Sequence, residues 1–140
     1  MNDRYELKRF VDAQEDVYKQ ACAELRAGRK RSHWMWFVFP QIKGLGNSPT
    51  AKQYAIKSRA EAAAYLEHPV LGPRLRECTQ LVIETESRTI GQIFGYPDDL
   101  KFHSSVTLFA QAGDDEVFVA ALRKYFNGAP DQATMELLRG

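Results

Sequence analysis

The chain has 140 residues, of which 44% are hydrophobic and 26% charged, values that are ordinary for one globular domain with a single core. Its net charge is +1, so overall charge gives no reason to expect a nucleic-acid or anionic-membrane partner. The longest apolar run, Trp34 to Phe39, is far shorter than the roughly 20 residues of a membrane span, and no apolar signal region begins the chain. We expect a cytoplasmic protein with no membrane partner.

Helix periodicity begins near the N-terminus. The apolar spacing predicts a first clear helix over residues 12–27, capped by Asp12 and ended by Gly28. Ser32 is placed to cap a short second helix through residues 34–38, and Pro40 ends it. A strand is the alternative for this second segment, because aromatic residues and valine also favour sheets.

The remainder of the chain alternates cap residues with helix-period segments. Ser58 and Glu61 form a capping-box pattern, and a long amphipathic helix is expected to end near Thr85. Other helix starts are expected at Ser48-Pro49, Thr89, Tyr96-Pro97, Asp114 and Asp131. The sequence thus predicts an all-α fold, a single compact domain of about eight short helices over residues 1–140.

Cysteine and histidine positions show no metal-ligand spacing. Cys22 and Cys78 each lie among helix-period apolar residues, so we interpret both as buried, reduced thiols. No zinc, EF-hand or dinucleotide motif is present. We therefore expect no metal site and no cofactor.

The segment from Arg29 to Gln41 is the most informative part of the chain. His33 is a candidate acid or base, or else a histidine that bonds a backbone carbonyl beside the core. Trp34 and Trp36 lie on different helix faces, so one can be core while the other lines a cleft, although both can be structural. The preceding cations are candidates for capturing a phosphate or carboxylate, or form a solvated helix end: Arg26, Arg29, Lys30 and Arg31.

A second polar cluster follows at residues 101–107. Lys101 and Ser105 are helix neighbours, so a desolvated lysine could activate the serine; the alternative is small polar residues at a tight helix crossing. The glycine-containing loop at residues 44–49 precedes a helix, where backbone N–H groups can receive an anion. Simple turn chemistry also explains this loop.

The signature Arg31-Ser-His-Trp-Met-Trp-Phe-Val-Phe-Pro-Gln41 resembles that of a widespread bacterial family of unknown function, sometimes mislabelled "calpastatin". Further matching pieces are Gly44-Leu-Gly46, His68-Pro69, Ile93-Phe94-Gly95, Asp98-Asp99-Leu100-Lys101 and Tyr125-Phe126-Asn127-Gly128. This resemblance implies a compact helical fold and no established activity. The aromatic-basic segment and the stretch Ala121 to Phe126 are also similar to a helical family that handles ADP-ribose-linked compounds.

Our leading hypothesis is a polar-aromatic pocket that binds an anionic, nucleotide-like small molecule. Its expected ligand-binding residues are Arg31, Ser32, Trp34, Trp36, Gln41 and Ser104. One alternative is a hydrolase of a glycosidic or phosphoester bond, to which the ADP-ribose resemblance also points. Its expected catalytic residues are His33 as acid or base, Lys101 and Ser105. The other alternative is a protein-interaction module without a pocket. The ligand and the oligomeric state stay open.

Overall fold

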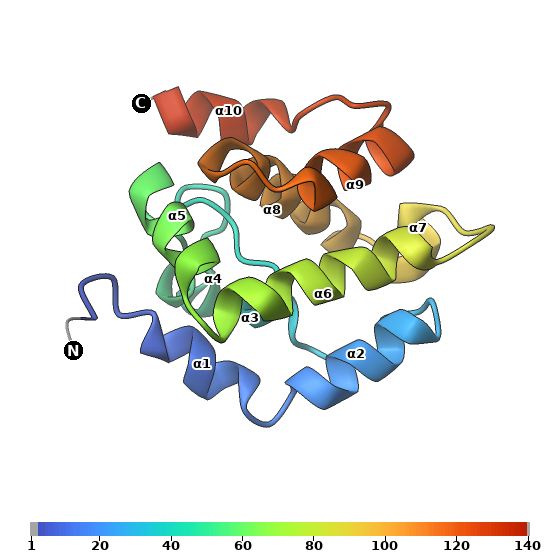
Figure 1. Cartoon of the computed structure of the whole chain (residues 1–140), viewed down its shortest axis with the longest axis horizontal. Coiled ribbons are helices and arrows are strands. Elements are labelled where there is room, and N and C mark those ends of the chain that lie inside the picture. The colour runs from blue at the N-terminus through green and yellow to red at the C-terminus, as the bar shows by residue number, and fades with distance from the viewer. Residues whose placement is uncertain (1–2, 140) are drawn as a thin grey trace.

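The computed structural model describes residues 3–139, and this part of the chain forms ten helices (Figure 1). They are α1 (Lys8–Gln14), α2 (Tyr18–Arg26), α3 (Met35–Val38), α4 (Pro49–Gln53), α5 (Arg59–Glu67), α6 (Leu71–Glu84), α7 (Ile90–Phe94), α8 (Asp98–Ala112), α9 (Glu116–Phe126) and α10 (Gln132–Arg139). Within residues 3–139 there is no strand, only an isolated parallel bridge between Ile42 and Ile56. The all-α, single-domain prediction is confirmed, and the helix count is close to the expected eight.

Two long helices organise the domain. The α6 helix crosses the middle of the molecule and packs against α2, α3, α5 and α9 (Figure 1). The α8 helix lies behind it and packs against α5, α7, α9 and α10. Between them lies a core rich in aromatic side chains, in which Phe39 meets the rings of Phe94 and Phe102 edge-on. Each such buried ring contributes about 1.5–3 kcal/mol through apolar burial.

The single helix predicted over residues 12–27 is wrong, because the chain turns between Gln14 and Tyr18. Asp12, expected as a cap, lies inside α1. The two halves bury their apolar faces in different directions, since α1 packs on α3 and α2 packs on α6. Gln14 holds the end of α1 inward, because its amide donates to the carbonyl of Phe37 and to the hydroxyl of Tyr65.

Most predicted caps are confirmed. Ser48 and Ser58 each accept a hydrogen bond from the backbone N–H of the third residue in the helix that follows. Thr89 forms a complete capping box with Gln92. Asp131 accepts from a backbone N–H at the start of α10. These side chains satisfy N–H groups that have no partner inside their own helix.

The cap predicted at Asp114 is wrong by one residue. The α9 helix begins after Asp115, and that carboxylate makes no cap hydrogen bond. It pairs instead with the guanidinium of Arg76 at 2.9 Å. The Asp115 carboxylate is thus used in a tertiary ion pair and not as a helix cap.

No helix of the described chain, residues 3–139, has both the length and the apolar character needed to cross a bilayer.

Candidate functional site

A groove of about 480 Å³ lies where the α3–α4 loop faces α8 and the start of α10. Its lining includes an aromatic ring, amides, hydroxyls and two charged groups, which belong to Trp36, Gln41, Asn47, Ser48, Lys101, Ser104 and Asp131. We call this feature the Trp36 groove. Its volume falls within the range of about 300–1,000 Å³ that is usual for small-molecule sites.

A cation and an aromatic ring lie side by side in the Trp36 groove. The Lys101 ammonium lies 4.2 Å from the centroid of the Trp36 ring, a cation–π contact. It also pairs with Asp98 at 3.2 Å. Asp98 is shared, because the nearly buried ammonium of Lys30 lies 2.8 Å from its other oxygen. Two ammonium groups therefore share one carboxylate, which leaves a net positive charge beside the indole.

Hydrogen-bonding groups also line the groove. The hydroxyl of Ser104 lies 3.1 Å from the carbonyl of Leu100 and 3.2 Å from Asp131 Oδ2. The backbone N–H and the hydroxyl of Thr134 also donate to that same oxygen. Among the described residues, Asp131 Oδ1 has no hydrogen-bond donor and the Gln41 side-chain amide has no partner. These groups are available to a ligand.

Four of the predicted site residues thus come together, although they were drawn from two separate segments. They are Trp36 and Gln41 from the first segment and Lys101 and Ser104 from the second. The two indoles separate as the helical wheel allowed: Trp36 is half-buried and lines the groove, whereas Trp34 is fully buried.

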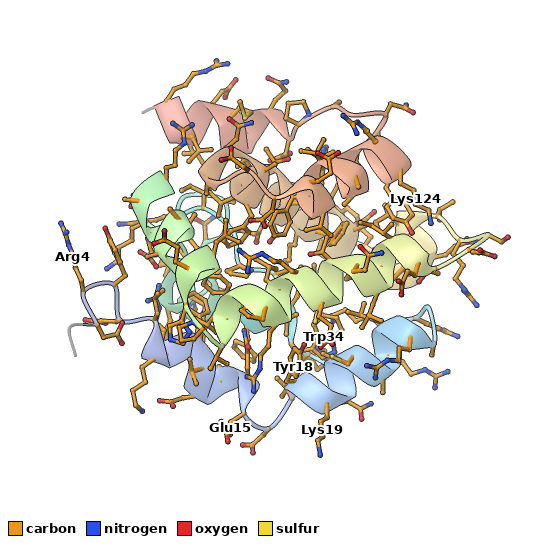
Figure 2. The ribbon with its side chains drawn as sticks, in the orientation of Figure 1. Arg4, Glu15, Tyr18, Lys19, Trp34 and Lys124 are labelled. Atoms are coloured by element: carbon orange, nitrogen blue, oxygen red, sulfur yellow. The ribbon has the colours of Figure 1, made fainter. Side chains whose placement is uncertain are left out.

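Trp34 and Ser32 belong to a different cluster, built around Glu24 of α2 (Figure 2 labels Trp34 beside α2). The indole N–H of Trp34 donates to Glu24 Oε1 at 2.9 Å, and the Ser32 hydroxyl donates to Oε2 at 2.5 Å. The backbone N–H groups of Arg31 and Ser32 donate to Oε1 as well. Ser32 is therefore not the cap of α3, which was a wrong prediction: its hydroxyl serves Glu24, and α3 begins only at Met35.

The hydrogen bonds around Glu24 change its acidity. Burial by itself raises the pKa of this carboxyl, but the hydrogen bonds from Ser32, Arg31 and Gln20 outweigh burial and lower the pKa to about 2. Glu24 is therefore ionised at neutral pH, and it fixes the chain between α2 and α3. Its role is structural, and it holds the segment that carries Trp36.

The remaining predicted site residues do not line the Trp36 groove. The side chains of Arg31 and His33 are exposed, and within residues 3–139 the His33 ring makes no hydrogen bond. Ser105 is fully buried, and its hydroxyl has no hydrogen-bond partner in the described chain. Lys101 and Ser105 therefore point in different directions: Lys101 faces Trp36, whereas Ser105 faces the interior.

Sequence reasoning missed three features of the site. Asp131 was expected only as a cap, yet its carboxylate lines the groove. Asp98 was expected only near a helix start, yet it holds the groove residue Lys101 in an ion pair. Leu100 lines the groove while 53% exposed. Nothing in the local pattern distinguishes these residues from ordinary surface positions, because their role depends on contacts with other segments of the chain, as between Asp131 and Ser104 or Asp98 and Lys30.

The cysteine prediction is confirmed, since Cys22 and Cys78 are both free and buried. In the part of the chain that the structure describes, no group of three or more His, Cys, Asp or Glu side chains is placed to hold a metal ion.

The chain matches a family model and a solved structure. The family model described as "Protein of unknown function (DUF1810)" matches residues 4–138. Among solved structures, the crystal structure of the conserved hypothetical protein Rv1873 from Mycobacterium tuberculosis is 58% identical and superposes with a TM-score of 0.97. That match covers 99% of each chain. No curated protein matches this chain.

Proposed function

The chain belongs to the DUF1810 family of proteins of unknown function, and we propose that it binds an anionic, nucleotide-like small molecule in the Trp36 groove. The observation that carries this proposal is the Lys101 ammonium held at 4.2 Å from the ring of Trp36, within a groove of ligand size. A planar ring can pack against the indole while an attached phosphate pairs with the lysine.

The ion pairs around Lys101 support an anionic group beside Trp36, because the other carboxylate of the groove, that of Asp131, forms an ion pair with neither lysine. Lys101 and Lys30 share a single carboxylate, that of Asp98, and the Lys30 side chain is only 7% exposed. Because the cluster is partly withdrawn from water, its excess positive charge is screened less than charge on an open surface. The residue that we expect to bind the anion is therefore Lys101, and Lys30 adds positive charge through the Asp98 carboxylate that the two lysines share. Arg31 does not line the groove.

Apolar side chains give the groove a place for a ring. Leu45, Pro97 and Leu100 line it together with Trp36, and the free amide of Gln41 can fix the orientation of a heterocycle. Predominantly apolar walls with a few polar groups are typical of small-molecule sites. A nucleobase with an attached sugar phosphate combines the ring, the anion and the polar groups that these walls accept.

The first prediction is ligand binding by the wild-type chain. Isothermal titration with AMP, GMP, CMP and UMP, alongside inorganic phosphate, should give saturable binding of at least one nucleotide. A concentration 100 times the Kd should stabilise the fold by about 2.7 kcal/mol in thermal unfolding. Lys101→Met should weaken nucleotide binding about tenfold or more, because a charge-assisted contact is lost.

Lys19→Met is the matched control, since Lys19 is an exposed lysine on the outer side of α2 (Figure 2). It should bind like the wild type. Trp36→Phe should abolish the ligand-induced change in tryptophan fluorescence while the buried Trp34 still reports an intact fold. The proposal fails if no nucleotide binds at millimolar concentration, or if the Lys19 and Lys101 variants lose affinity equally.

The two alternatives stay predictions. A hydrolase that uses His33 would work outside the Trp36 groove, on an exposed side chain without a hydrogen-bonded partner among the described residues. An interaction module would use exposed apolar residues, of which Tyr96 at 82% and Leu100 at 53% lie near one another in sequence. Concentration-dependent self-association without nucleotide binding would favour the interaction module.

A further inference from the structure

We infer, on the premise of the proposed function, that Asp131 and Ser104 bind a vicinal diol, so that the Trp36 groove selects ribonucleotides over deoxyribonucleotides. Asp131 and Ser104 both line the groove, and the hydrogen bonds that each already makes show which of their atoms are left for a ligand.

The Asp131 carboxylate is fixed in orientation by one of its oxygens. Oδ2 accepts from the Thr134 hydroxyl at 2.6 Å, from the Thr134 backbone N–H at 3.1 Å and from Ser104 at 3.2 Å. Thr134 supplies two donors to Oδ2, and the single proton of Ser104 is divided between Oδ2 and the carbonyl of Leu100. The other oxygen, Oδ1, has no donor from the described chain. Since Asp131 lines the groove, Oδ1 is a preorganised acceptor that pays little further ordering entropy on binding.

Ser104 adds a second acceptor beside it. Its proton is used within the protein, because the hydroxyl donates toward the carbonyl of Leu100 and toward Asp131. The lone pairs of Ser104 Oγ are then what remains for a ligand. Two adjacent acceptors match a ligand that brings two adjacent donors, and neighbouring hydroxyl groups do so. The negative charge of Asp131 repels a phosphate, so these acceptors favour hydroxyl groups.

The spacing of Lys101 and Ser104 on α8 suits a sugar phosphate. Lys101 and Ser104 are three residues apart on α8, so their Cα atoms are about 4.5 Å apart along the helix axis and their side chains leave the same side of the helix. In a nucleoside 5′-phosphate, the phosphate and the 2′,3′-diol are attached to opposite edges of one ribose ring. A single ribose can therefore direct its phosphate to Lys101 and its diol to Asp131.

The test compares each of AMP, GMP, CMP and UMP with its 2′-deoxy counterpart by isothermal titration. The wild-type chain should bind the ribonucleotide about tenfold or more tightly, because a hydrogen bond to a charged acceptor is lost with the 2′-hydroxyl. Asp131→Asn should reduce this preference to near unity. Asparagine is also a good helix cap, so its oxygen can keep the bonds from Thr134 while its NH2 group turns to the groove.

Two further variants make the result specific. Ser104→Ala should weaken the ribonucleotide preference and leave Asp131 in place. Asp114→Asn, an exposed carboxylate outside the groove, should change nothing. Equal affinity of the wild-type chain for ribo and deoxy forms overturns the diol inference and leaves the proposed function standing. Retention of the preference by Asp131→Asn also overturns it, and the absence of any nucleotide binding overturns both.

Discussion

At the scale of single residues, Glu24 does the most to shape the segment that carries the site. Its two oxygens accept five hydrogen bonds, of which four come from residues 31–34. A buried carboxylate is tolerated only when its charge is compensated by such donors. The sequence signature around Trp34 is therefore partly explained by folding, because its serine and its first tryptophan serve this carboxylate.

Glu24→Gln should destabilise the protein by about 2 kcal/mol, because charge-assisted hydrogen bonds become neutral and one oxygen becomes a donor that faces other donors. Urea unfolding at pH 7 measures this loss. Glu15→Gln, at an exposed glutamate between α1 and α2, is the control and should have little effect. Equal stability of the two variants would contradict the role given to Glu24.

The same residue gives a pH dependence. The pKa of Glu24 is about 2 in the fold, against an ordinary value of 4.5. A lowered folded-state pKa contributes stability that is present above pH 4.5 and is lost as the pH falls from 4.5 through 2. The wild-type chain should therefore lose more stability than Glu24→Gln across that interval. If the free energy of unfolding fell equally with pH in the two proteins, the pH dependence would not come from Glu24.

At the scale of elements, the corner between α5 and α6 depends on a close backbone approach. A Cβ atom added to Gly72 would lie 2.1 Å from the carbonyl oxygen of Leu66, at the end of α5. The obstacle is backbone, so it cannot move aside like a flexible side chain. His68 completes the corner, because its Nδ1 accepts from the backbone N–H groups of Val70 and Leu71.

Gly72→Ala should therefore destabilise the fold by about 3 kcal/mol or more, through overpacking against backbone. Gly91→Ala is the matched control: Gly91 is exposed in α7, and its added Cβ would meet nothing closer than 3.8 Å. That variant should be stabilised by up to about 1 kcal/mol, since alanine favours helix more than glycine does. Thermal unfolding of both variants checks the opposite signs, and a tolerated Gly72→Ala would refute the tight corner.

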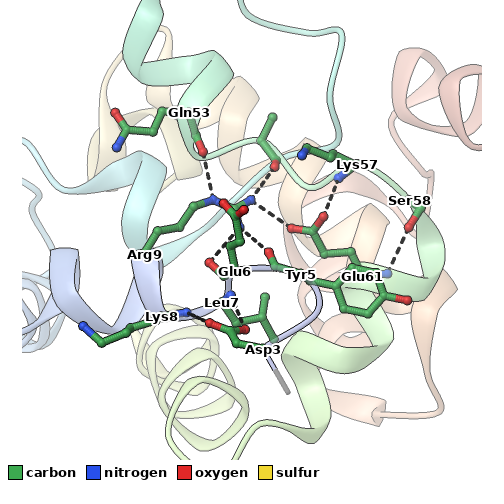
Figure 3. A network of polar contacts seen from close by, with 11 residues as sticks. Asp3, Tyr5, Glu6, Leu7, Lys8, Arg9, Gln53, Lys57, Ser58 and Glu61 are labelled. Atoms are coloured by element: carbon green, nitrogen blue, oxygen red, sulfur yellow. Dashed lines mark hydrogen bonds and ion pairs between the residues drawn. The ribbon is translucent and has the colours of Figure 1, made fainter. Parts of the chain in front are cut away.

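At the scale of the whole molecule, Arg9 joins the N-terminal segment to the region before α5 (Figure 3). Its guanidinium donates to the carbonyls of Tyr5, Glu6, Gln53 and Ala55 and to the carboxylate of Glu61. Glu61 is 1% exposed in its side chain, so this pair is largely withdrawn from water. One planar side chain thus ties α1, the α4–α5 connection and α5 together.

Arg9→Lys should cost about 2 kcal/mol even though the charge is kept, because a lysine cannot reach five acceptors with a rigid fork. Arg4→Lys, at an exposed arginine on the same segment, should be nearly neutral. Urea unfolding of both variants gives the comparison. A small effect of Arg9→Lys would show that charge rather than geometry holds the N-terminal segment.

Local sequence determined the helical fold, because its signals act within a few residues. The caps at Ser48, Ser58, Thr89 and Asp131 satisfy N–H groups of their own helices, so they can be predicted without knowing the partners. The helical wheel also allowed the two indoles to lie on different sides, one of them at a cleft.

Tertiary contacts decided what the sequence left open. The helix breaks after Gln14 because α1 and α2 pack on different helices. Ser32 does not cap α3 because its hydroxyl donates to Glu24 instead. Tertiary packing also decides the site, because the packing of α8 against its neighbours turns Lys101 toward Trp36 and Ser105 toward the core. Hydrogen bonds and ion pairs between distant segments carry no local periodicity, so they become visible only when the chain is folded.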